Sequence, residues 1–300
     1  ITLTGNITLA NAALADLDIN SKVFISGDVT IDTDNATHDG LVDFASTIDG
    51  VNGGDDDDLI ILAGDTAQGG ILTLSGAIGS TQALTTLNIN ATDGDISFTV
   101  PQVGDGSGAA GVTGATAFGF SGSGDIIFSA GGANAYNFGG ALTVTSNGGA
   151  GAFQFTGSDP TVTAGGAVAF NEGAGTDDTM VLADLKDLTI DTSAANANVT
   201  LPNIDGTAGD GDDQTDFTVD AGSGTVDVQT IDTDINDVII TGSTITLNGD
   251  ITTAAGTGGG ADAASIDLNG AVVIAGGTRT LTSGNGTIDF SSTVNSEASQ

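Results

Sequence analysis

The residues best suited to chemistry are four consecutive aspartates, Asp55 to Asp58, which follow the pair Gly53 and Gly54. Calcium takes about six to eight oxygen ligands, and clustered carboxylates on a flexible glycine-rich segment can supply them. The acidic loop 52–58 therefore predicts a calcium site, and the competing interpretation is a charged loop that protrudes into solvent.

A short calcium-binding repeat gives this segment a second argument. Residues 53–60 resemble one copy of the nonapeptide Gly-Gly-x-Gly-x-Asp-x-Leu-x, with Asp56 in the place of the third Gly and Ile60 in the place of Leu. In proteins built from this repeat, calcium lies between successive copies, whereas this sequence contains one imperfect copy. The resemblance implies calcium as a cofactor and leaves the solvated loop open.

Two further acidic patches are similar in kind. One surrounds Asn35 and the other covers 205–216, and neither has the Gly and Glu spacing of an EF-hand. At each patch a polar turn is the competing interpretation. The candidate calcium ligands are Asp55, Asp56, Asp57, Asp58, Asp32, Asp34, Asp39, Asp210, Asp212 and Asp213, and the second patch also contains Asp205 and Asp216.

The sequence offers no recognisable catalytic constellation. His38 is the one histidine and lies in an Asp-rich turn, where an exposed and isolated side chain is the better interpretation. Pairs of carboxylates can hydrolyse glycosides, but among so many aspartates some pair will lie at a suitable distance by chance. We therefore expect no enzyme and no catalytic residues, with a polysaccharide-active β-helix enzyme as the distant alternative.

The charge balance excludes several classes of partner. The sequence has 39 acidic residues against three basic ones, Lys22, Lys186 and Arg279, which gives a formal net charge of -36. Nucleic-acid binding needs clustered Lys and Arg, and docking on anionic lipid needs the same. No run of about 18 apolar residues is present, so we expect no transmembrane segment.

The termini and the cysteine content bear on the cellular location. The chain begins at Ile1 and contains no Cys. We take the start to indicate either a fragment of a longer protein or the removal of a leader. Lack of Cys removes disulfides as a source of stability, which fits some bacterial surface proteins and also fits a cytosolic protein. The expected location is extracellular, at the cell surface.

Short strand signals dominate the chain. Apolar and polar residues alternate in runs of about three to five residues, and Gly, Asn, Asp or Ser follows almost every run and supplies a turn. Helix signals are weak because Gly, Thr, Asn and Asp interrupt the Ala-rich stretches. Examples of the strand runs are Val23 to Ile25, Leu72 to Leu74, Leu142 to Val144 and Ile245 to Leu247.

Two internal repeats give the strongest information on architecture. Residues 1–50 recur with small gaps as 245–296: Ile1 to Thr8 align with Ile245 to Thr252 without a gap. A second pair relates 84–128 to 185–228, and it places Pro101 opposite Pro202. One local geometry is therefore used more than once.

These features predict an all-β fold, a parallel β-helix or β-solenoid with short strands and Gly, Asp and Asn turns. Short strands that cannot bury an apolar face alone must stack on copies of themselves. We expect one continuous shaft segment over 1–300, with about 20–25 residues per coil. The alternative is a row of antiparallel β-sandwich domains, which normally carry longer strands and a Trp or Tyr in the core.

The pattern of short motifs along the chain resembles that of the giant repeat-rich surface proteins of Gram-negative bacteria, the filamentous-haemagglutinin-like and β-strand-repeat adhesins. The resemblance extends over the whole chain. Motifs that carry it include Thr2 to Asn6, Phe44 to Ile48 and Leu84 to Asn90. In that family such repeats form long, secreted β-helical shafts. Their amino-terminal secretion domain has no counterpart in these residues.

The resulting functional hypothesis is a structural or adhesive extracellular shaft of a long, repetitive, secreted surface protein. The alternative is a self-assembling filament or surface-layer subunit, because terminal coils of a solenoid expose unpaired strand edges. The expected partners are other copies of the chain, joined end to end or laterally, and glycans or proteins of a host or neighbouring cell surface.

Overall fold

The fold is entirely β in the part of the chain that the structure describes. The computed structural model describes residues 1–9, 16–33, 41–51, 56–63, 72–91, 97–120, 124–146, 151–171, 179–207, 215–232, 234–254 and 263–297. Within these ranges no helix is found, and therefore none that is long and apolar enough to cross a membrane. All strand pairings among these residues are parallel, from β1 on β4 at the start to β27 on β29 and β30 at the end.

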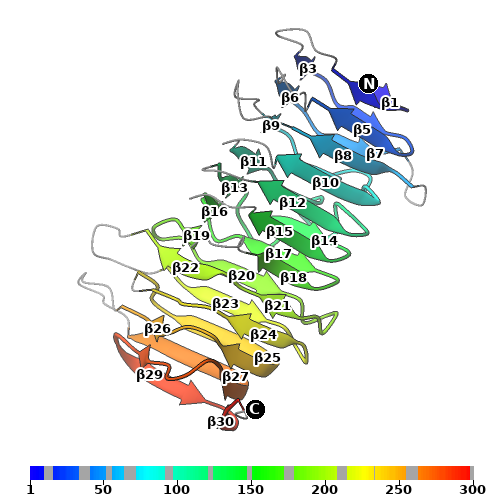
Figure 1. Ribbon diagram of the computed structural model, residues 1–300. Helices are drawn as coiled ribbons and strands as arrows, with labels where there is room; N and C mark the ends of the chain where they lie inside the picture. Colours follow the sequence, from blue (N-terminus) through cyan, green and yellow to red (C-terminus); the bar gives the residue numbers. More distant parts are fainter. Residues whose placement is uncertain are drawn as a thin grey trace.

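The chain winds as a solenoid around a prism with three faces, and each coil contributes a short strand or a single bridge to each face (Figure 1). Face 1 contains β1 (Thr2–Leu3), β4 (Val23–Ile25), β7 (Ile48–Gly50), β14 (Tyr136–Phe138), β17 (Thr161–Ala164), β20 (Leu188–Asp191), β23 (Phe217–Asp220), the first halves of β25 (Val238–Leu247) and β27 (Ala264–Ile274), and β29 (Asn285–Phe290). Ile78 and Val103 bridge β7 to β14 on this face.

Faces 2 and 3 are stacked in the same way. Face 2 contains β2 (Ile7–Thr8), β5 (Val29–Asp32), β8 (Asp58–Leu62), β10 (Thr86–Ala91), β12 (Thr116–Phe120), β15 (Leu142–Ser146), β18 (Val168–Asn171), β21 (Val199–Thr200), β24 (Thr225–Val228), the second halves of β25 and β27, and β30 (Val294–Ser296). Face 3 contains β3 (Leu17–Ile19), β6 (Val42–Phe44), β9 (Leu72–Leu74), β11 (Phe98–Val100), β13 (Ile126–Phe128), β16 (Ala152–Phe155), β19 (Thr179–Leu182), β22 (Asn203–Gly206), β26 (Ile251–Thr252) and β28 (Leu281–Thr282).

The predicted parallel β-helix is confirmed, and the alternative of antiparallel sandwiches is wrong. The expected coil length of about 20–25 residues fits some coils and is too short for others. The register on face 1 advances by 22 residues from Thr2 to Phe24 but by 33 from Val103 to Tyr136. The reason is local: Val103 and Val112 both lie on face 1, and the segment between them is an additional turn within the coil.

The interior is filled by one continuous apolar cluster, because alternate residues of each strand point inward. Its middle part is rich in aromatic rings. The ring of Phe128 stacks on Phe155 at 4.6 Å between centroids and meets Tyr136 edge-on at 5.3 Å, and Phe118 and Phe170 complete its surroundings. These side chains come from all three faces, so the aromatic cluster ties the faces together.

Glycine is required where neighbouring coils approach most closely. Gly79 has φ +65°, and a Cβ at this position would lie 1.9 Å from the carbonyl oxygen of Gly111 in the next coil. The abundance of glycine, 48 residues in this sequence, therefore has a steric cause at such corners.

The two copies of the long internal repeat occupy different faces. Thr2–Leu3 lies on face 1 and Ile7–Thr8 on face 2, whereas the matching residues 245–247 lie on face 2 and Ile251–Thr252 on face 3. The second copy of the repeat is therefore shifted by one face relative to the first, and a similar strand, corner and strand occur at two different edges of the prism.

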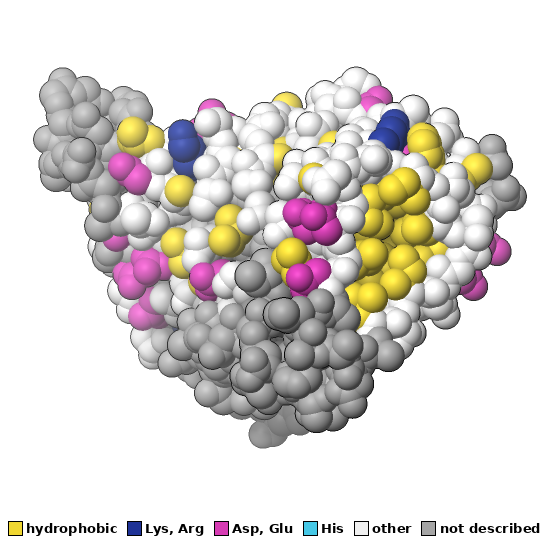
Figure 2. All heavy atoms as spheres, turned by 90° about the horizontal axis from the view of Figure 1, so that it is seen from above, with side chains coloured by type: hydrophobic (Ala, Val, Ile, Leu, Met, Phe, Trp, Pro, Cys, Tyr) yellow, Lys and Arg dark blue, Asp and Glu magenta, His cyan; other side chains and the backbone are white. Residues whose placement is uncertain are grey.

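The first coil leaves part of its apolar side uncovered. Seen from above, with the N-terminal end of Figure 1 toward the viewer, hydrophobic side chains gather in one patch (Figure 2). Ile1 is 57% exposed, and Leu3, Ile7 and Leu17 are only partly buried against the core. At the other end, Ile288, Phe290 and Val294 are exposed.

The aromatic cluster provides a test of the core. Phe128→Ala removes a fully buried ring and should lower the free energy of unfolding by about 3–5 kcal/mol, as measured by urea denaturation. Leu185→Ala, at a 51% exposed side chain on the flank of the shaft, is the control and should cost less than about 1 kcal/mol. Equal losses for the two variants would contradict the placement of the core.

Candidate functional site

Beyond the backbone pairing of the strands, a recurring polar interaction among the described residues is a hydrogen bond from the backbone of one coil to a side chain of the preceding coil. A carboxylate or amide oxygen accepts the N–H of a residue 21 to 30 positions later in the chain. We call these acceptors the rung-bridging side chains. They are Asn6, Asp16, Asp125, Asp159, Asp187, Asn196, Asn198, Asn203, Asp216, Asp237 and Asp250.

Four of them form an unbroken row just before face 1. Asp159 Oδ1 accepts the N–H of Asp187 at 3.2 Å, and Asp187 Oδ1 accepts that of Asp216 at 2.9 Å. Asp216 Oδ1 in turn accepts the N–H of Asp237 at 3.1 Å, and Asp237 Oδ1 accepts that of Ser265 at 2.6 Å. The row extends the strand pairing of face 1 beyond the strands themselves, into the corner where turns would otherwise lack partners.

The row brings like charges close together, and this proximity affects the pKa of Asp216. The pKa of its carboxyl is raised to about 6, mainly by partial burial and in addition by the neighbouring carboxylates of Asp187 and Asp237. The hydrogen bonds from the Asp237 N–H and from Asn236 oppose the rise but do not cancel it. Asp216 is thus poised to take up a proton near neutral pH.

A second carboxyl with a raised pKa lies on face 3. Desolvation is the main cause of the raised pKa of Asp205, followed by repulsion from Asp232 and Asp234. Asp205 and Asp232 line a shallow hollow of about 250 Å³ together with Thr179, Asn203 and Thr230. The sequence had grouped Asp205 with Asp216, but the structure places the two on different faces.

The last residues of the predicted acidic loop are more buried than the sequence suggested. Asp57 is only 1% exposed: its Oδ1 accepts the N–H of Gly27 at 3.0 Å and its Oδ2 accepts the N–H of Val51 at 2.8 Å. Asp58 belongs to β8, and its Oδ1 is buried without a hydrogen-bond partner, while Asp56 is exposed. The carboxylate of Asp57 is therefore used to hold backbone amides of two other segments.

The remaining predicted calcium ligands are mostly beyond the described ranges. Asp32 lies half-buried in β5. Within the described ranges, no group of three or more His, Asp or Glu side chains is placed to hold a metal ion. The residues that lie outside the described ranges are Asp55, Asp34, Asp39, Asp210, Asp212 and Asp213, together with His38.

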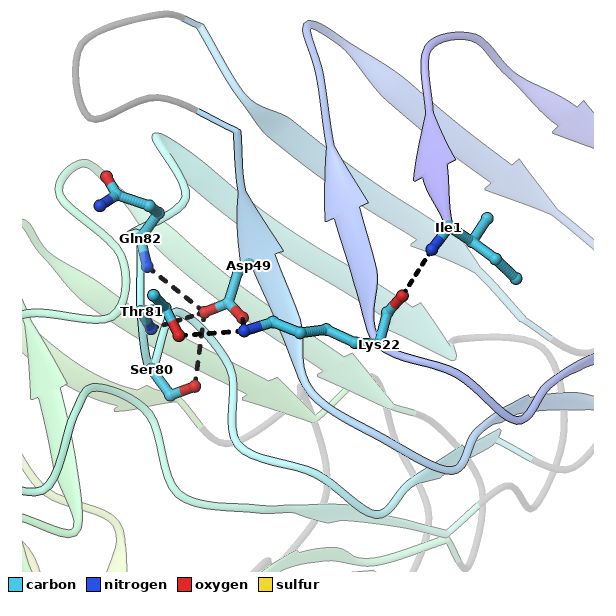
Figure 3. Close-up of polar contacts among 6 residues, drawn as sticks. All are labelled: Ile1, Lys22, Asp49, Ser80, Thr81 and Gln82. Carbon is cyan, nitrogen blue, oxygen red and sulfur yellow. Dashed lines mark hydrogen bonds and ion pairs between the residues drawn. The ribbon is translucent and has the colours of Figure 1, made fainter.

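An ion pair between the buried Asp49 and the partly exposed Lys22 links the second and third coils (Figure 3). Asp49 is fully buried, and its Oδ2 lies 3.0 Å from Nζ of Lys22. Its Oδ1 accepts the N–H of Thr81 at 2.7 Å, with Ser80 Oγ and Gln82 N at 3.4 Å. The amino group of Ile1 donates to the carbonyl of Lys22 at 2.8 Å, so the same lysine residue also anchors the first strand.

Sequence reasoning did not predict the pairing of Asp49 with Lys22 or the rung-bridging row. A signal for the row was present, because Asp187, Asp216 and Asp237 each directly precede an apolar strand start, at Leu188, Phe217 and Val238. The pairing of Asp49 with Lys22 had no such signal. It depends on the coil length, which varies from coil to coil.

The raised pKa of Asp216 predicts that stability increases on mild acidification. The native state binds a proton with a pKa of about 6, whereas the unfolded carboxyl binds it only near pH 4. Between these values the native state holds more protons, so the free energy of unfolding rises as the pH falls. From pH 7.5 to 5 we expect a gain of about 1 kcal/mol after allowance for solvent screening at this half-exposed group.

Urea denaturation at a series of pH values measures this gain. Asp216→Asn keeps an acceptor for the Asp237 N–H and should remove the pH-dependent part. Asp250→Asn is the matched control, because Asp250 accepts the N–H of Thr280 at 2.9 Å in the same manner. A gain that survives in Asp216→Asn would show that other carboxyls are responsible.

Comparison with known proteins adds no relative: no family model, curated protein or solved structure matches the chain.

Proposed function

We propose that residues 1–300 form a structural shaft segment of a long, repetitive, secreted protein at the cell surface, where the shaft serves as a fibre or carries adhesive surfaces. The observation that carries the proposal is the uninterrupted parallel stack, with one apolar core and rung-bridging side chains along its length. Such a stack is stiff. It can be lengthened by adding further coils, because each coil contacts only its neighbours.

The charge distribution supports the same role. A net charge of -36 disfavours polyanionic ligands. Partners of the shaft would then be further copies of the chain, or glycans and proteins on a host or neighbouring surface. We propose no catalytic role for the chain.

Electron microscopy of the purified chain tests the shaft. Uniform, thin, unbranched rods are the expected result, with a width that does not vary along each particle. Globular particles would overturn the proposal.

A polysaccharide-active enzyme remains the second candidate, because Asp205 combines a raised pKa with a place in a surface hollow beside Asp232. No Lys or Arg is among the residues that line this hollow, so an acidic polysaccharide would meet only like charge. Turnover of a neutral polysaccharide that is lost in Asp205→Asn would replace the shaft by this candidate.

We also propose that the acidic turns bind calcium, which would neutralise carboxylates and bridge neighbouring loops. Calcium that binds only the folded state raises its stability by mass action. Chelation should therefore lower the melting temperature, and millimolar calcium should restore it better than sodium chloride of the same ionic strength. Equal restoration by sodium chloride would show that charge screening alone acts.

A further inference from the structure

Both ends of the stack present strand edges that have no partner among the described residues. The first coil exposes Ile1, and the last coil exposes Ile288, Phe290 and Val294. Exposed ends alone do not identify an occupant. The internal repeats do so, because segments closely similar to both ends lie next to each other inside the shaft.

The segment at the first end has a duplicate that is paired on both sides. Ile1 to Thr8 match Ile245 to Thr252 without a gap. Inside the shaft, the duplicate receives β24 on one side, with Val226 opposite Ile245 and Val228 opposite Leu247, and β27 on the other. The same kind of segment therefore accepts a strand on the edge that is open at Ile1.

The segment at the last end resembles the partner of that duplicate. Gly284 to Phe290 read Gly-Asn-Gly-Thr-Ile-Asp-Phe, and Gly222 to Val228 read Gly-Ser-Gly-Thr-Val-Asp-Val. With one additional residue, Val294 then matches Ile231, which bridges to Ile251 inside the shaft. The last described coil thus carries a segment of the kind that stacks on the segment in the first coil.

From this juxtaposition we propose that two copies of the chain stack head to tail, the last coil of one copy docking on the first coil of the second. The internal junction fixes the register. Ile288 of one copy lies opposite Ile1 of the other, Asp289 opposite Thr2, Phe290 opposite Leu3, and Val294 opposite Ile7. The inference rests on the proposed shaft function and supplies its partner, a second copy of this chain.

The three-faced geometry agrees with this register independently of the sequence match. β29 and β1 both lie on face 1, and β30 and β2 both lie on face 2. Docking in this register therefore continues two faces at once without rotation of one copy about the shaft axis. Matching segments at the wrong faces would have required a twist of one third of a turn.

The internal junction also shows which backbone bonds would form. Asn248 N donates to Val228 O at 2.8 Å, Ile231 N to Asp250 O at 2.9 Å and Thr252 N to Ile231 O at 2.9 Å. Their counterparts are Thr4 N to Phe290 O, Val294 N to Asn6 O and Thr8 N to Val294 O. Burial of the apolar side chains of both ends adds a hydrophobic contribution.

Two single substitutions block one end each. Ile1→Asp places a carboxylate on the first coil and Val294→Asp places one on the last, at side chains that are 57% and 48% exposed, so each monomer should still fold. Sedimentation velocity in about 0.5 M sodium chloride, where charge repulsion is screened, should show a concentration-dependent series of oligomers for the unmodified chain. Each variant should associate at least about tenfold more weakly, because a charge would be buried at the junction.

A mixture of the two variants gives the sharper result. The free last coil of Ile1→Asp fits the free first coil of Val294→Asp, so the mixture should form dimers and nothing larger. Leu185→Asp, at a 51% exposed side chain on the flank of the shaft, is the matched control and should assemble like the unmodified chain. A mixture that stays monomeric, or a control that is blocked as strongly as the end variants, would overturn the inference.

Cysteine cross-linking tests the register, since the chain has no Cys of its own. Paired residues of adjacent parallel strands lie about 4.8 Å apart, within the range for a disulfide. Oxidation of Thr2→Cys/Asp289→Cys should give a ladder of covalent multimers, and Thr2→Cys/Thr287→Cys, displaced by two residues, should not. Equal cross-linking of both pairs would overturn the register.

The results of electron microscopy and sedimentation distinguish head-to-tail docking from the shaft proposal. Single rods of one length in the electron microscope, together with monomers in sedimentation, would overturn head-to-tail docking and leave the shaft proposal intact. Globular particles would overturn the shaft proposal, whatever the state of association.

Discussion

The structure depends on one constraint: each coil must satisfy its backbone groups on the coil before it and the coil after it. The short parallel strands do this on the three faces, and the rung-bridging side chains do it at the corners, where the chain leaves one face for the next. Because a side-chain oxygen takes the place of a strand carbonyl there, corners of differing length can be stacked without leaving buried amides unpaired. The apolar interior and the close approach at Gly79 follow from the same stacking.

This constraint also explains how so acidic a chain can be compact. Asp187 and Asp237 each accept a backbone N–H from the following coil, and Asp57 accepts two from other segments, so their negative charge is directed at donors as well as at solvent. Where carboxylates follow one another in a row, repulsion accumulates, and the raised pKa of Asp216 is its visible result. A proton or a cation can relieve this strain, and both would act by favouring the stacked state.

The sequence was sufficient for the class of fold and insufficient for the positions of polar groups. Alternation in runs such as Val23 to Ile25 predicts inward and outward residues correctly, because strand geometry has a fixed period of two. Coil length has no such period, so contacts between coils, such as Lys22 with Asp49, could not be derived. Leu185 shows the same limit of the sequence. The repeat aligns it with the buried Leu84, but in the structure Leu185 lies in a turn with φ +57° and is exposed. For the acidic loop, composition indicated charge, whereas burial of Asp57 depends on where Gly27 and Val51 lie.

Amide hydrogen exchange measured by NMR tests the central claim most directly. The N–H groups of Asp187, Asp216 and Asp237 lie outside the strands and bond only to rung-bridging carboxylates in this structure. If those side chains hold the coils together, the three amides should exchange as slowly as strand amides such as those of Ile190 and Val219, because exchange then requires coils to separate. Exchange at the rate of solvated turns, with the strand amides still protected, would contradict the account.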